Sequence, residues 1–470
     1  MPSKPVGIEA MYVYTPQFCV TSETLANARG AKLTHFTEGI GIGSFSFPPP
    51  NEDHVSMAAT AALRLMKEQD IDPRDIARID LATESSREGS RGAPSDVVGA
   101  LEQAFGTNSF RHVAGVEYKF ACIGGVEALR NSCALAAPDW LPEGRHNIVI
   151  ATDFARYHLR SGEEPTQGAA AAALLIGRKP RLLEIVPRAY GSAMRYEPGD
   201  FSKPGGRSIA NVNGGLSVGS YLSEMRTAWS GFIAAVKETG FIVPSSGMCV
   251  SDSIDKGIWH NPHLKQVQSA HASLLMHEWI GLPSKQDIFR NLGTPPERGE
   301  TPDHVFYASQ PYKDYRKRFM KEPVVVRDFD KRIKPSTVAP FDIGNSYSAS
   351  VFVGIDSLFE TDPEDLAGKT VVLAGYGSGS HALIQATRVP EDYMPVAKRL
   401  DLMNRLKRRE HLSIGAYETW HDFHDGVQSG LVKPSDISLP RSFASPTFVL
   451  SSVGAIKSPT EGQRTYALVA

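Results

Sequence analysis

The amino-acid sequence predicts an α/β fold, and three observations carry that prediction. Apolar segments of strand length alternate with longer segments whose apolar residues recur at helical spacing. The chain has 470 residues, which is too long for one simple core and favours several domains or a duplicated one. A repeated spacing supports duplication. The distance in sequence from Cys122 to the apolar run at Ile148 equals the distance from Asn345 to the apolar run at Val371.

The elements can be assigned in chain order from these patterns. The first predicted helix places Val55, Ala58 and Leu63 on one face. The run from Asn147 is short and wholly apolar, as in a buried strand, and the alanine-rich strand after Gly168 suits a crowded place. The assignments are strand 7–14, helix 54–69, strand 76–83, helix 94–105, strand 113–120, strand 147–151, strand 168–176 and helix 220–238.

Residues 282–340 differ from the rest of the chain. The segment is rich in proline and charge, with basic clusters at 313–321 and 331–334. We interpret it as a solvated insertion. The alternative is a basic patch near an anionic ligand, such as a phosphate-bearing cofactor or substrate.

Composition and charge exclude several classes of function. The formal net charge of −2 gives no electrostatic reason to expect nucleic acid or an anionic membrane as a partner. The sequence holds no apolar run long enough to span a bilayer, and its first residues lack the pattern of a signal or transit peptide. Four cysteines without paired spacing suggest a reducing compartment, so the cytoplasm is expected.

Cys122 is the first candidate for chemistry. It lies between the strand predicted at 113–120 and a helix predicted from Val126, followed by Gly124 and Gly125. Unpaired N–H groups and the dipole at a helix N-terminus favour the thiolate, which is the reactive form, and glycines let a substrate approach closely. A buried structural cysteine is the alternative interpretation.

Three further segments carry groups suited to a site. Glu84 follows a predicted strand, where partial burial would raise its pKa towards use as a general base; a solvated loop carboxylate is the alternative. His260 lies before Pro262, which excludes simple helical continuation, and Lys265 could pair with a phosphate. His260 and His263 lack partners at metal-binding spacing. The turn after Tyr376 could present backbone N–H groups to an oxyanion.

Together these segments resemble the hydroxymethylglutaryl-CoA synthase family of the thiolase superfamily, in order over nearly the whole chain. Two runs are specific in combination: Glu-Pro-Thr-Gln-Gly-Ala from Glu164, and His-x-Pro-x-x-Lys from His260. The other matching segments are 6–9, 39–41, 82–85, 121–122, 150–153, 155–157, 344–347, 376–379 and 416–419.

The resemblance implies a ping-pong condensation of acetyl-CoA with acetoacetyl-CoA and water, giving 3-hydroxy-3-methylglutaryl-CoA for the mevalonate pathway. Cys122 would carry the acetyl group, Glu84 would act as general acid and base, and His260 would hold the acetoacetyl thioester. No metal, nicotinamide or flavin is implied, only CoA thioesters as substrates. The implied substrate-binding residues are Thr166, Lys265, Asn345, Tyr347 and Ser378.

The resemblance also implies a thiolase-like duplicated αβαβα layered fold, with two mixed sheets and central helices opened by Cys122 and Asn345. The N-terminal half would be 1–180, and the C-terminal half 181–470 would hold the insertion at 282–340. A homodimer is expected, with a thiolase or an acyl carrier protein as candidate partners.

Three segments depart from the family pattern, and the first two bear on acyl preference more than on reaction type. Ser202 and Lys203 stand where the family has an aromatic residue and arginine, Asn213 stands where aspartate is frequent, and Ile123 follows the cysteine. Two related activities stay open as alternatives. One is a polyketide β-branching synthase acting on a carrier-bound acceptor, and the other is a β-ketoacyl-ACP synthase III-like enzyme, against which Glu84 argues. A non-catalytic scaffold is disfavoured by the intact candidate residues.

Overall fold

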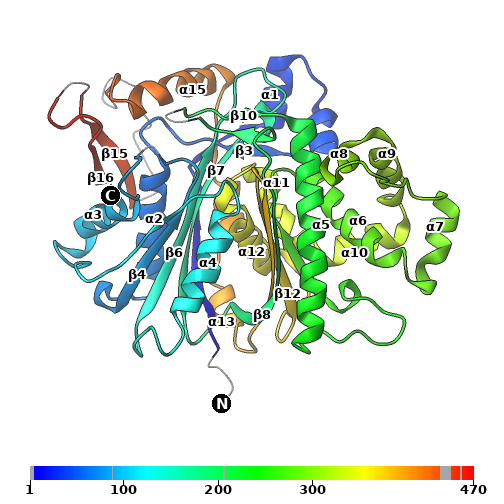
Figure 1. Ribbon diagram of the computed structural model, residues 1–470. Coiled ribbons are helices and arrows are strands. Elements are labelled where there is room, and N and C mark those ends of the chain that lie inside the picture. The colour runs from blue at the N-terminus through cyan, green and yellow to red at the C-terminus, as the bar shows by residue number, and fades with distance from the viewer. Residues whose placement is uncertain (1–4, 87, 205–206, 434–445, 456–457, 470) are drawn as a thin grey trace.

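The computed structural model describes residues 5–86, 88–204, 207–433, 446–455 and 458–469. Met1–Lys4, which begin the N-terminal segment considered above, lie outside the described residues. A nine-stranded mixed sheet forms the centre, with helices on both outer faces and two helices inside its curve (Figure 1). In spatial order its strands are β11 (Lys256–Trp259), β12 (Thr370–Gly377), β13 (His381–Arg388), β8 (Leu183–Met194), β1 (Gly7–Tyr14), β7 (Gly168–Gly177), β6 (His146–Ala155), β4 (Ile76–Ala82) and β5 (Glu117–Tyr118).

The two halves of this sheet repeat one pattern of strand directions. In the N-terminal half β4 pairs parallel with β6, and β6–β7 and β7–β1 are antiparallel. In the C-terminal half β11 pairs parallel with β12, and β12–β13 and β13–β8 are antiparallel. The halves join through a short seam, in which Gly7 and Ile8 of β1 face Glu184 and Leu183 of β8. The two predicted sheets are thus the two halves of one continuous sheet.

Five layers follow from the packing of helices on the sheet. The outer layer on one side contains α2 (His54–Glu68) and α3 (Pro94–Phe105), and α5 (Gly214–Glu238) and α6 (Leu264–Trp279) cover the other side. The central layer contains α4 (Gly124–Leu135) and α12 (Ser350–Thr361), which lie between the two halves of the sheet (Figure 1). This is the layered arrangement predicted from the resemblance.

The remaining elements surround these layers. Short strands form three further ladders: β14 (Glu410–His411), β2 (Phe18–Thr21) and β3 (Ser44–Ser46); β9 (Phe201–Ser202) and β10 (Asn211–Val212); β15 (Thr447–Val453) and β16 (Arg464–Val469). The outlying helices are α1 (Ser22–Arg29), α7 (Gln286–Leu292), α8 (Asp303–Ala308), α9 (Gln310–Phe319), α10 (Pro323–Arg332), α11 (Val338–Ile343), α13 (Met394–Ala397), α14 (Leu402–Lys407) and α15 (Ile414–Gln428). Single turns are η1 (His35–Ile40), η2 (Pro73–Asp75), η3 (Glu164–Thr166), η4 (Ser251–Ser253), η5 (Pro283–Lys285), η6 (Lys334–Thr337) and η7 (Tyr347–Ala349).

Two local predictions were wrong. The strand predicted at 113–120 is shortened to β5, because the chain around it meets β4 only at isolated positions before turning into the Cys122 loop. The predicted solvated insertion at 282–340 is instead largely helical. It buries aromatic side chains of α8 and α9, such as Tyr307 and Phe319, in one cluster with α5 and α6. Most charged residues of α9 lie on its opposite face, although Arg316 is buried beside the aromatic side chains. The exposed charges are why composition alone suggested a solvated segment.

The two central helices touch at a glycine. A Cβ built on Gly125 of α4 would lie 2.3 Å from the Ser348 carbonyl oxygen and 2.9 Å from the Phe352 ring. Only a residue without a side chain permits this approach of backbone to backbone.

Gly125→Ala is therefore expected to destabilise the protein by about 1–3 kcal/mol, because the added methyl overpacks the contact between the central helices. Thermal unfolding followed by circular dichroism would measure the change as a lower midpoint. The matched control is Gly99→Ala on α3, where a Cβ meets nothing within 4 Å. That variant should gain about 0.5–1 kcal/mol from helix propensity. Equal midpoints for both variants would contradict the close packing.

Candidate active site

A cavity of about 290 Å³ lies where both central helices begin, and residues from both halves of the chain line it. Six of the predicted site residues take part, which are Cys122, Thr166, His260, Asn345, Tyr347 and Ser378. Glu84 joins them through a hydrogen bond with the Cys122 thiol rather than as part of the cavity wall. Segments that are remote in sequence thus converge on one pocket.

Cys122 lies in a tight turn before α4. Ala121 has a positive φ of 43°, and Gly344, at the corresponding point before Asn345, has a φ of 80°. This left-handed turn directs the chain towards Gly124, where the helix begins. The thiol donates to the Glu84 Oε1 atom at 3.1 Å.

The prediction of a thiolate at Cys122 was wrong. Burial raises the pKa of the Cys122 thiol well above its usual range, and the Glu84 carboxyl raises it further. Because α4 starts two residues later, the helix terminus does not outweigh that desolvation. Cys122 is therefore a neutral thiol whose proton points at a base.

Glu84 is held beside the thiol by a buried carboxylate, Asp153. Asp153 Oδ1 accepts the Glu84 backbone N–H at 2.9 Å, the Thr83 hydroxyl at 2.9 Å and the Ser85 hydroxyl at 2.6 Å. Its Oδ2 atom accepts the Ser348 backbone N–H at 3.0 Å. One side chain therefore ties the Glu84 loop to the turn that precedes the second central helix.

The surroundings of Glu84 make its carboxyl a stronger base than usual. Burial, together with the negative charge of Asp153, raises its pKa to about 8, and the Lys203 ammonium and the hydrogen bond from Cys122 limit that rise. Lys203 Nζ donates to the Glu84 backbone carbonyl at 3.2 Å. The carboxylate can thus take up a proton near neutral pH, as a general base must.

His260 follows directly after β11 and is anchored through its backbone. Its N–H donates to the Ala374 carbonyl at 2.7 Å, and its carbonyl accepts the Tyr221 hydroxyl at 2.9 Å. Burial lowers the pKa of the imidazole to about 3. Its Nδ1 atom is buried and has no hydrogen-bond partner among the described residues. A neutral imidazole can form a hydrogen bond with a carbonyl oxygen or a sulfur atom placed in the cavity.

Asn345 and Thr166 are joined through the backbone. The Asn345 N–H donates to the Thr166 carbonyl at 3.3 Å, and its Oδ1 atom accepts the Tyr347 N–H at 3.0 Å. Gly168 and Gly344 form a bridge beside them, and a Cβ on Gly168 would meet the Asn345 backbone nitrogen at 2.7 Å. The specific run from Glu164 thus positions the residues that begin the second central segment.

The turn that carries Ser378 packs against the Cys122 loop. A Cβ on Gly377 would lie 2.5 Å from the Phe120 carbonyl and 3.0 Å from the Ile123 nitrogen, so the two backbones are in close contact. The Tyr376 hydroxyl donates to Asp200 Oδ2 at 3.0 Å, which fixes the start of the turn. Both loops end at the cavity, as a pair of backbone donors for one oxyanion requires.

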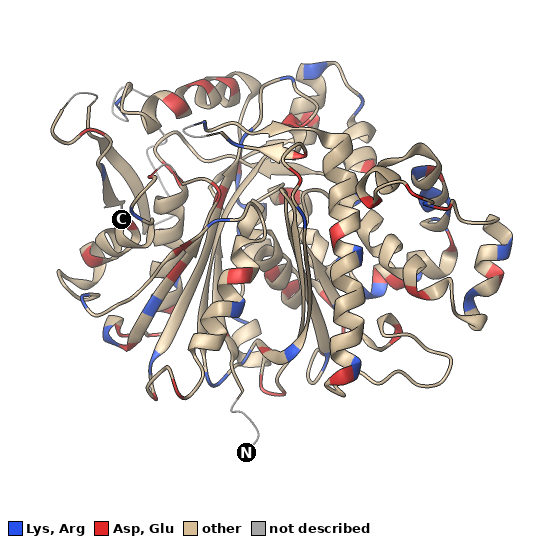
Figure 2. Ribbon diagram, in the orientation of Figure 1, with Lys and Arg blue, Asp and Glu red and all other residues tan. Residues whose placement is uncertain are grey.

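Lys265 is placed outside the lining of the cavity. It lies in the first turn of α6, between His263 and Gln266, which do line it. Lys and Arg are interspersed with Asp and Glu along the ribbon (Figure 2). Asp153 and Tyr221, which contact Glu84 and His260, were not predicted from the sequence. An acidic residue at the end of an apolar strand could have indicated Asp153, whereas nothing in its helix distinguishes Tyr221.

Two absences concern only the part of the chain that the structure describes. There, His, Cys, Asp and Glu side chains form no group of three that could hold a metal ion. No helix within those residues combines the length and apolar character needed to cross a membrane.

Comparison with known proteins identifies the family. The model of the hydroxymethylglutaryl-coenzyme A synthase N-terminal region matches residues 2–181, and that of the C-terminal region matches 189–429. The chain belongs to the hydroxymethylglutaryl-CoA synthase family. Within it, the chain is 32% identical over 432 residues to the hydroxymethylglutaryl-CoA synthase of Haloferax volcanii, covering 89% of this chain and 92% of that one.

Other members of the hydroxymethylglutaryl-CoA synthase family are also similar to this chain in sequence or structure. The Schizosaccharomyces pombe enzyme is 32% identical over 425 residues, covering 88% of this chain and 89% of its own. The solved structure of MvaS in complex with 3-hydroxy-3-methylglutaryl coenzyme A matches with a TM-score of 0.82 and 27% identity over the full length of both chains. The curacin biosynthetic pathway HMG synthase matches with a TM-score of 0.76 and 21% identity, covering 99% of this chain and 100% of that one, and shows the shared fold.

Proposed function

We propose that the protein is a hydroxymethylglutaryl-CoA synthase, an acyltransferase that condenses acetyl-CoA with acetoacetyl-CoA and water to give 3-hydroxy-3-methylglutaryl-CoA and CoA. The observation that carries the proposal is the hydrogen bond between Cys122 Sγ and Glu84 Oε1 in the cavity that His260 and Asn345 also line. A nucleophile, a base of raised pKa and a neutral imidazole are the groups that a thioester condensation needs.

The first half-reaction attaches the acetyl group to the protein. The Cys122 sulfur attacks the thioester carbonyl of acetyl-CoA as Glu84 takes the thiol proton, and collapse of the tetrahedral intermediate breaks the bond to the CoA sulfur. The departing CoA sulfur then takes the proton, which returns Glu84 to its carboxylate form. Backbone N–H groups of Cys122 and Ser378 are suited to the developing oxyanion, since their two turns end together.

The second half-reaction forms the carbon–carbon bond. Glu84 removes a proton from the acetyl methyl group, and the resulting enolate attacks the ketone carbon of acetoacetyl-CoA. The new alkoxide takes the proton back from Glu84, and water then cleaves the Cys122 thioester to release the product acid. His260, neutral because burial lowers its pKa to about 3, hydrogen bonds to the acetoacetyl thioester in this half-reaction and assists CoA departure in the first. Asn345, Tyr347 and Thr166 shape the acyl end of the pocket.

The cellular context follows from the same proposal. The product feeds the mevalonate pathway, and the chemistry needs no metal, nicotinamide or flavin. Four free cysteines in the structure support a reducing compartment, for which we propose the cytoplasm. A homodimer is proposed from the layout of thiolase-like folds, and Lys265 is proposed to meet a CoA phosphate near the mouth of the cavity.

Product analysis tests the proposed reaction. Purified protein mixed with acetyl-CoA and acetoacetyl-CoA should yield 3-hydroxy-3-methylglutaryl-CoA, detected by liquid chromatography and mass spectrometry. A parallel reaction with acetoacetyl groups on an acyl carrier protein separates this function from polyketide β-branching. Faster turnover of the carrier-bound acceptor than of acetoacetyl-CoA would contradict the proposal.

The pH dependence of turnover is expected to report the Glu84 carboxyl. Since the base must be ionised to remove a proton, the rate should rise with pH through a value near 8. The Lys203 charge lowers this pKa, so Lys203→Gln should move the rise to higher pH. Steady-state rates from pH 6 to 10 would measure the shift.

Lys203→Arg is the matched control for this experiment. It keeps the positive charge and matches the arginine of the family pattern, so its profile should stay close to that of the unmodified protein. A rise that stays in place, or moves to lower pH, in Lys203→Gln would remove Lys203 from the electrostatics of Glu84.

A further inference from the structure

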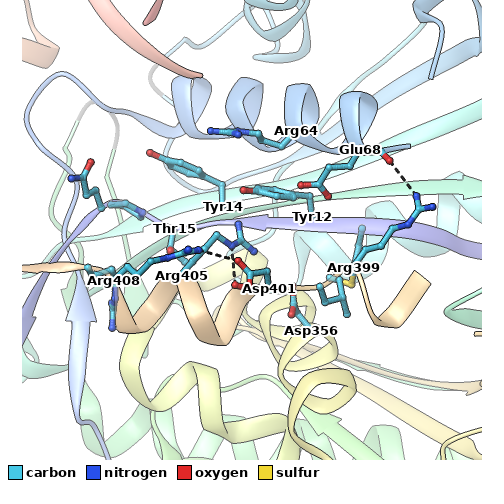
Figure 3. Close-up of a pocket in the computed structure, with 15 residues that line it drawn as sticks. Tyr12, Tyr14, Thr15, Arg64, Glu68, Asp356, Arg399, Asp401, Arg405 and Arg408 are labelled. Carbon is cyan, nitrogen blue, oxygen red and sulfur yellow. Dashed lines mark hydrogen bonds and ion pairs between the residues drawn. The ribbon is translucent and has the colours of Figure 1, made fainter. Parts of the chain in front are cut away.

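A second cavity, of about 460 Å³, lies apart from the proposed active site and shares no lining residue with it. Figure 3 shows that its walls come from four remote segments. These are the end of β1 with the loop after it, the last turns of α2, the middle of α12, and residues 399–409 around α14. Its volume falls in the range of pockets that bind small molecules.

Positive charge dominates the walls of this cavity. Five arginines line it against three acidic residues, although the whole chain carries a net charge of −2. The arginines are Arg64, Arg399, Arg405, Arg408 and Arg409. A local excess of this kind, enclosed by protein, attracts anions more strongly than the same charges spread over a surface.

Three of these guanidinium groups donate to neutral acceptors. Arg405 donates to the Asp401 and Val13 backbone carbonyls, at 3.2 and 2.8 Å. Arg399 donates to the Glu68 carbonyl and the Gln69 side-chain oxygen. Arg409 donates to backbone carbonyls and to serine hydroxyls of β3. These contacts hold the groups in place, while the Glu68 carboxyl near Arg399 and Arg405 and the Asp342 carboxyl near Arg409 supply the nearby negative charge.

The one acidic residue on the floor adds little negative charge. Asp356 of α12 is fully buried, and neither carboxyl oxygen has a hydrogen-bond partner among the described residues. Burial and the neighbouring Glu360 carboxyl raise the pKa of Asp356 well above its usual range. Because burial disfavours the ionised form, this carboxyl contributes less negative charge to the cavity than an exposed carboxylate would.

The arginines lie both inside the cavity and at its rim. Arg405 is half-buried, with its guanidinium 4.3 Å above the Tyr12 ring, whereas Arg399 and Arg408 are exposed at the edge (Figure 3). Arg408 makes an ion pair with Asp401 at 3.0 Å, which holds it beside the opening. Planar guanidinium groups at several depths match the oxygen-rich surface of linked phosphoryl groups.

We propose that this cavity is a binding site for a small anion that carries two or more linked phosphoryl groups. The phosphoryl chain would lie along Arg399, Arg405 and Arg408. The site is separate from the condensation chemistry and does not depend on the proposed function.

Isothermal titration calorimetry of the full chain with sodium tripolyphosphate tests the proposal. At low ionic strength we expect saturable binding at one site per chain. The double variant Arg399→Gln/Arg408→Gln should weaken it at least tenfold, because two charge-assisted contacts at the rim are lost. Arg290→Gln, an exposed arginine on α7 that pairs with Asp287, is the matched control and should bind as before. Equal thermal midpoints without ligand would show that the variants are folded.

Two further titrations identify the source of the phosphoryl groups and separate the two sites. ATP binding that is tighter than tripolyphosphate binding, and weakened by the same double variant, would point to a nucleotide. Weaker ATP binding would point to a free oligophosphate. Lys265→Gln, which changes the residue proposed to meet a CoA phosphate and does not line this cavity, should leave the tripolyphosphate isotherm unchanged. The proposal fails if tripolyphosphate does not bind, if the double variant binds it equally well, or if Lys265→Gln weakens binding as much as the double variant does.

Discussion

Cys122→Ala is expected to lose the covalent acetyl adduct completely and to lower condensation by a factor of at least about 10⁴. The sulfur is the atom to which the acetyl group is attached, and the Cys122 side chain is the thiol that lines the active-site cavity. Without it the acetyl donor has no covalent intermediate, and the enolate would have to form on free acetyl-CoA. Intact-protein mass spectrometry after mixing with acetyl-CoA measures the adduct directly.

Cys133→Ala is the matched control for this experiment. Cys133 lies on α4 close to Cys122 in sequence, but it is buried in the core, and burial raises the pKa of its thiol. That variant should acquire the acetyl group normally. If the adduct persisted in Cys122→Ala and disappeared in Cys133→Ala, the acetylated residue would be Cys133 and the proposed role of Cys122 would be wrong.

Glu84→Gln is expected to separate the two half-reactions. The amide keeps the size and one oxygen of the side chain, but it cannot take a proton. Acetylation should be slower, because the Cys122 thiol then has no base beside it. The same amount of acetyl adduct should still form in the end, because CoA can still depart from the thioester. Proton removal from the acetyl methyl group has no substitute, so condensation should fall by about 10³–10⁴.

Two measurements on one sample check this separation. Mass spectrometry follows the acetyl adduct, and chromatography follows 3-hydroxy-3-methylglutaryl-CoA. Glu88→Gln, an exposed carboxylate near Glu84 in sequence, should behave like the unmodified protein in both. Normal product formation by Glu84→Gln would remove that residue from the mechanism.

The architecture could largely be predicted because its signals are local. Strands such as β1 and β12 are short apolar runs, and the spacing shared by Cys122–Ile148 and Asn345–Val371 reflects two halves with the same strand directions. The segment 282–340 was misjudged for a related reason. Its charged residues dominate the composition, whereas the buried aromatic faces of α8 and α9 become apparent only once they pack on α5 and α6.

The sequence could predict which residues lie together at the cavity, but it could not predict how burial shifts the pKa values of their side chains. The family motifs, which occur in the expected order along the chain, indicated Glu84, Cys122 and His260. Whether a helix terminus or desolvation controls the thiol depends on where α4 begins and on what surrounds the sulfur. The role of Asp153 likewise depends on Ser348, which is remote in sequence and contacts it only after the halves have come together.

The contact of Gly125 with Ser348 and Phe352 has a consequence for how such a chain can evolve. Two copies of an ancestral unit would at first be free to diverge, each at its own pace. Once their innermost segments met without space for a methyl group, a change on one copy required a compensating change on the other. We therefore expect the tolerated substitutions around these three positions to be correlated in natural and laboratory variants.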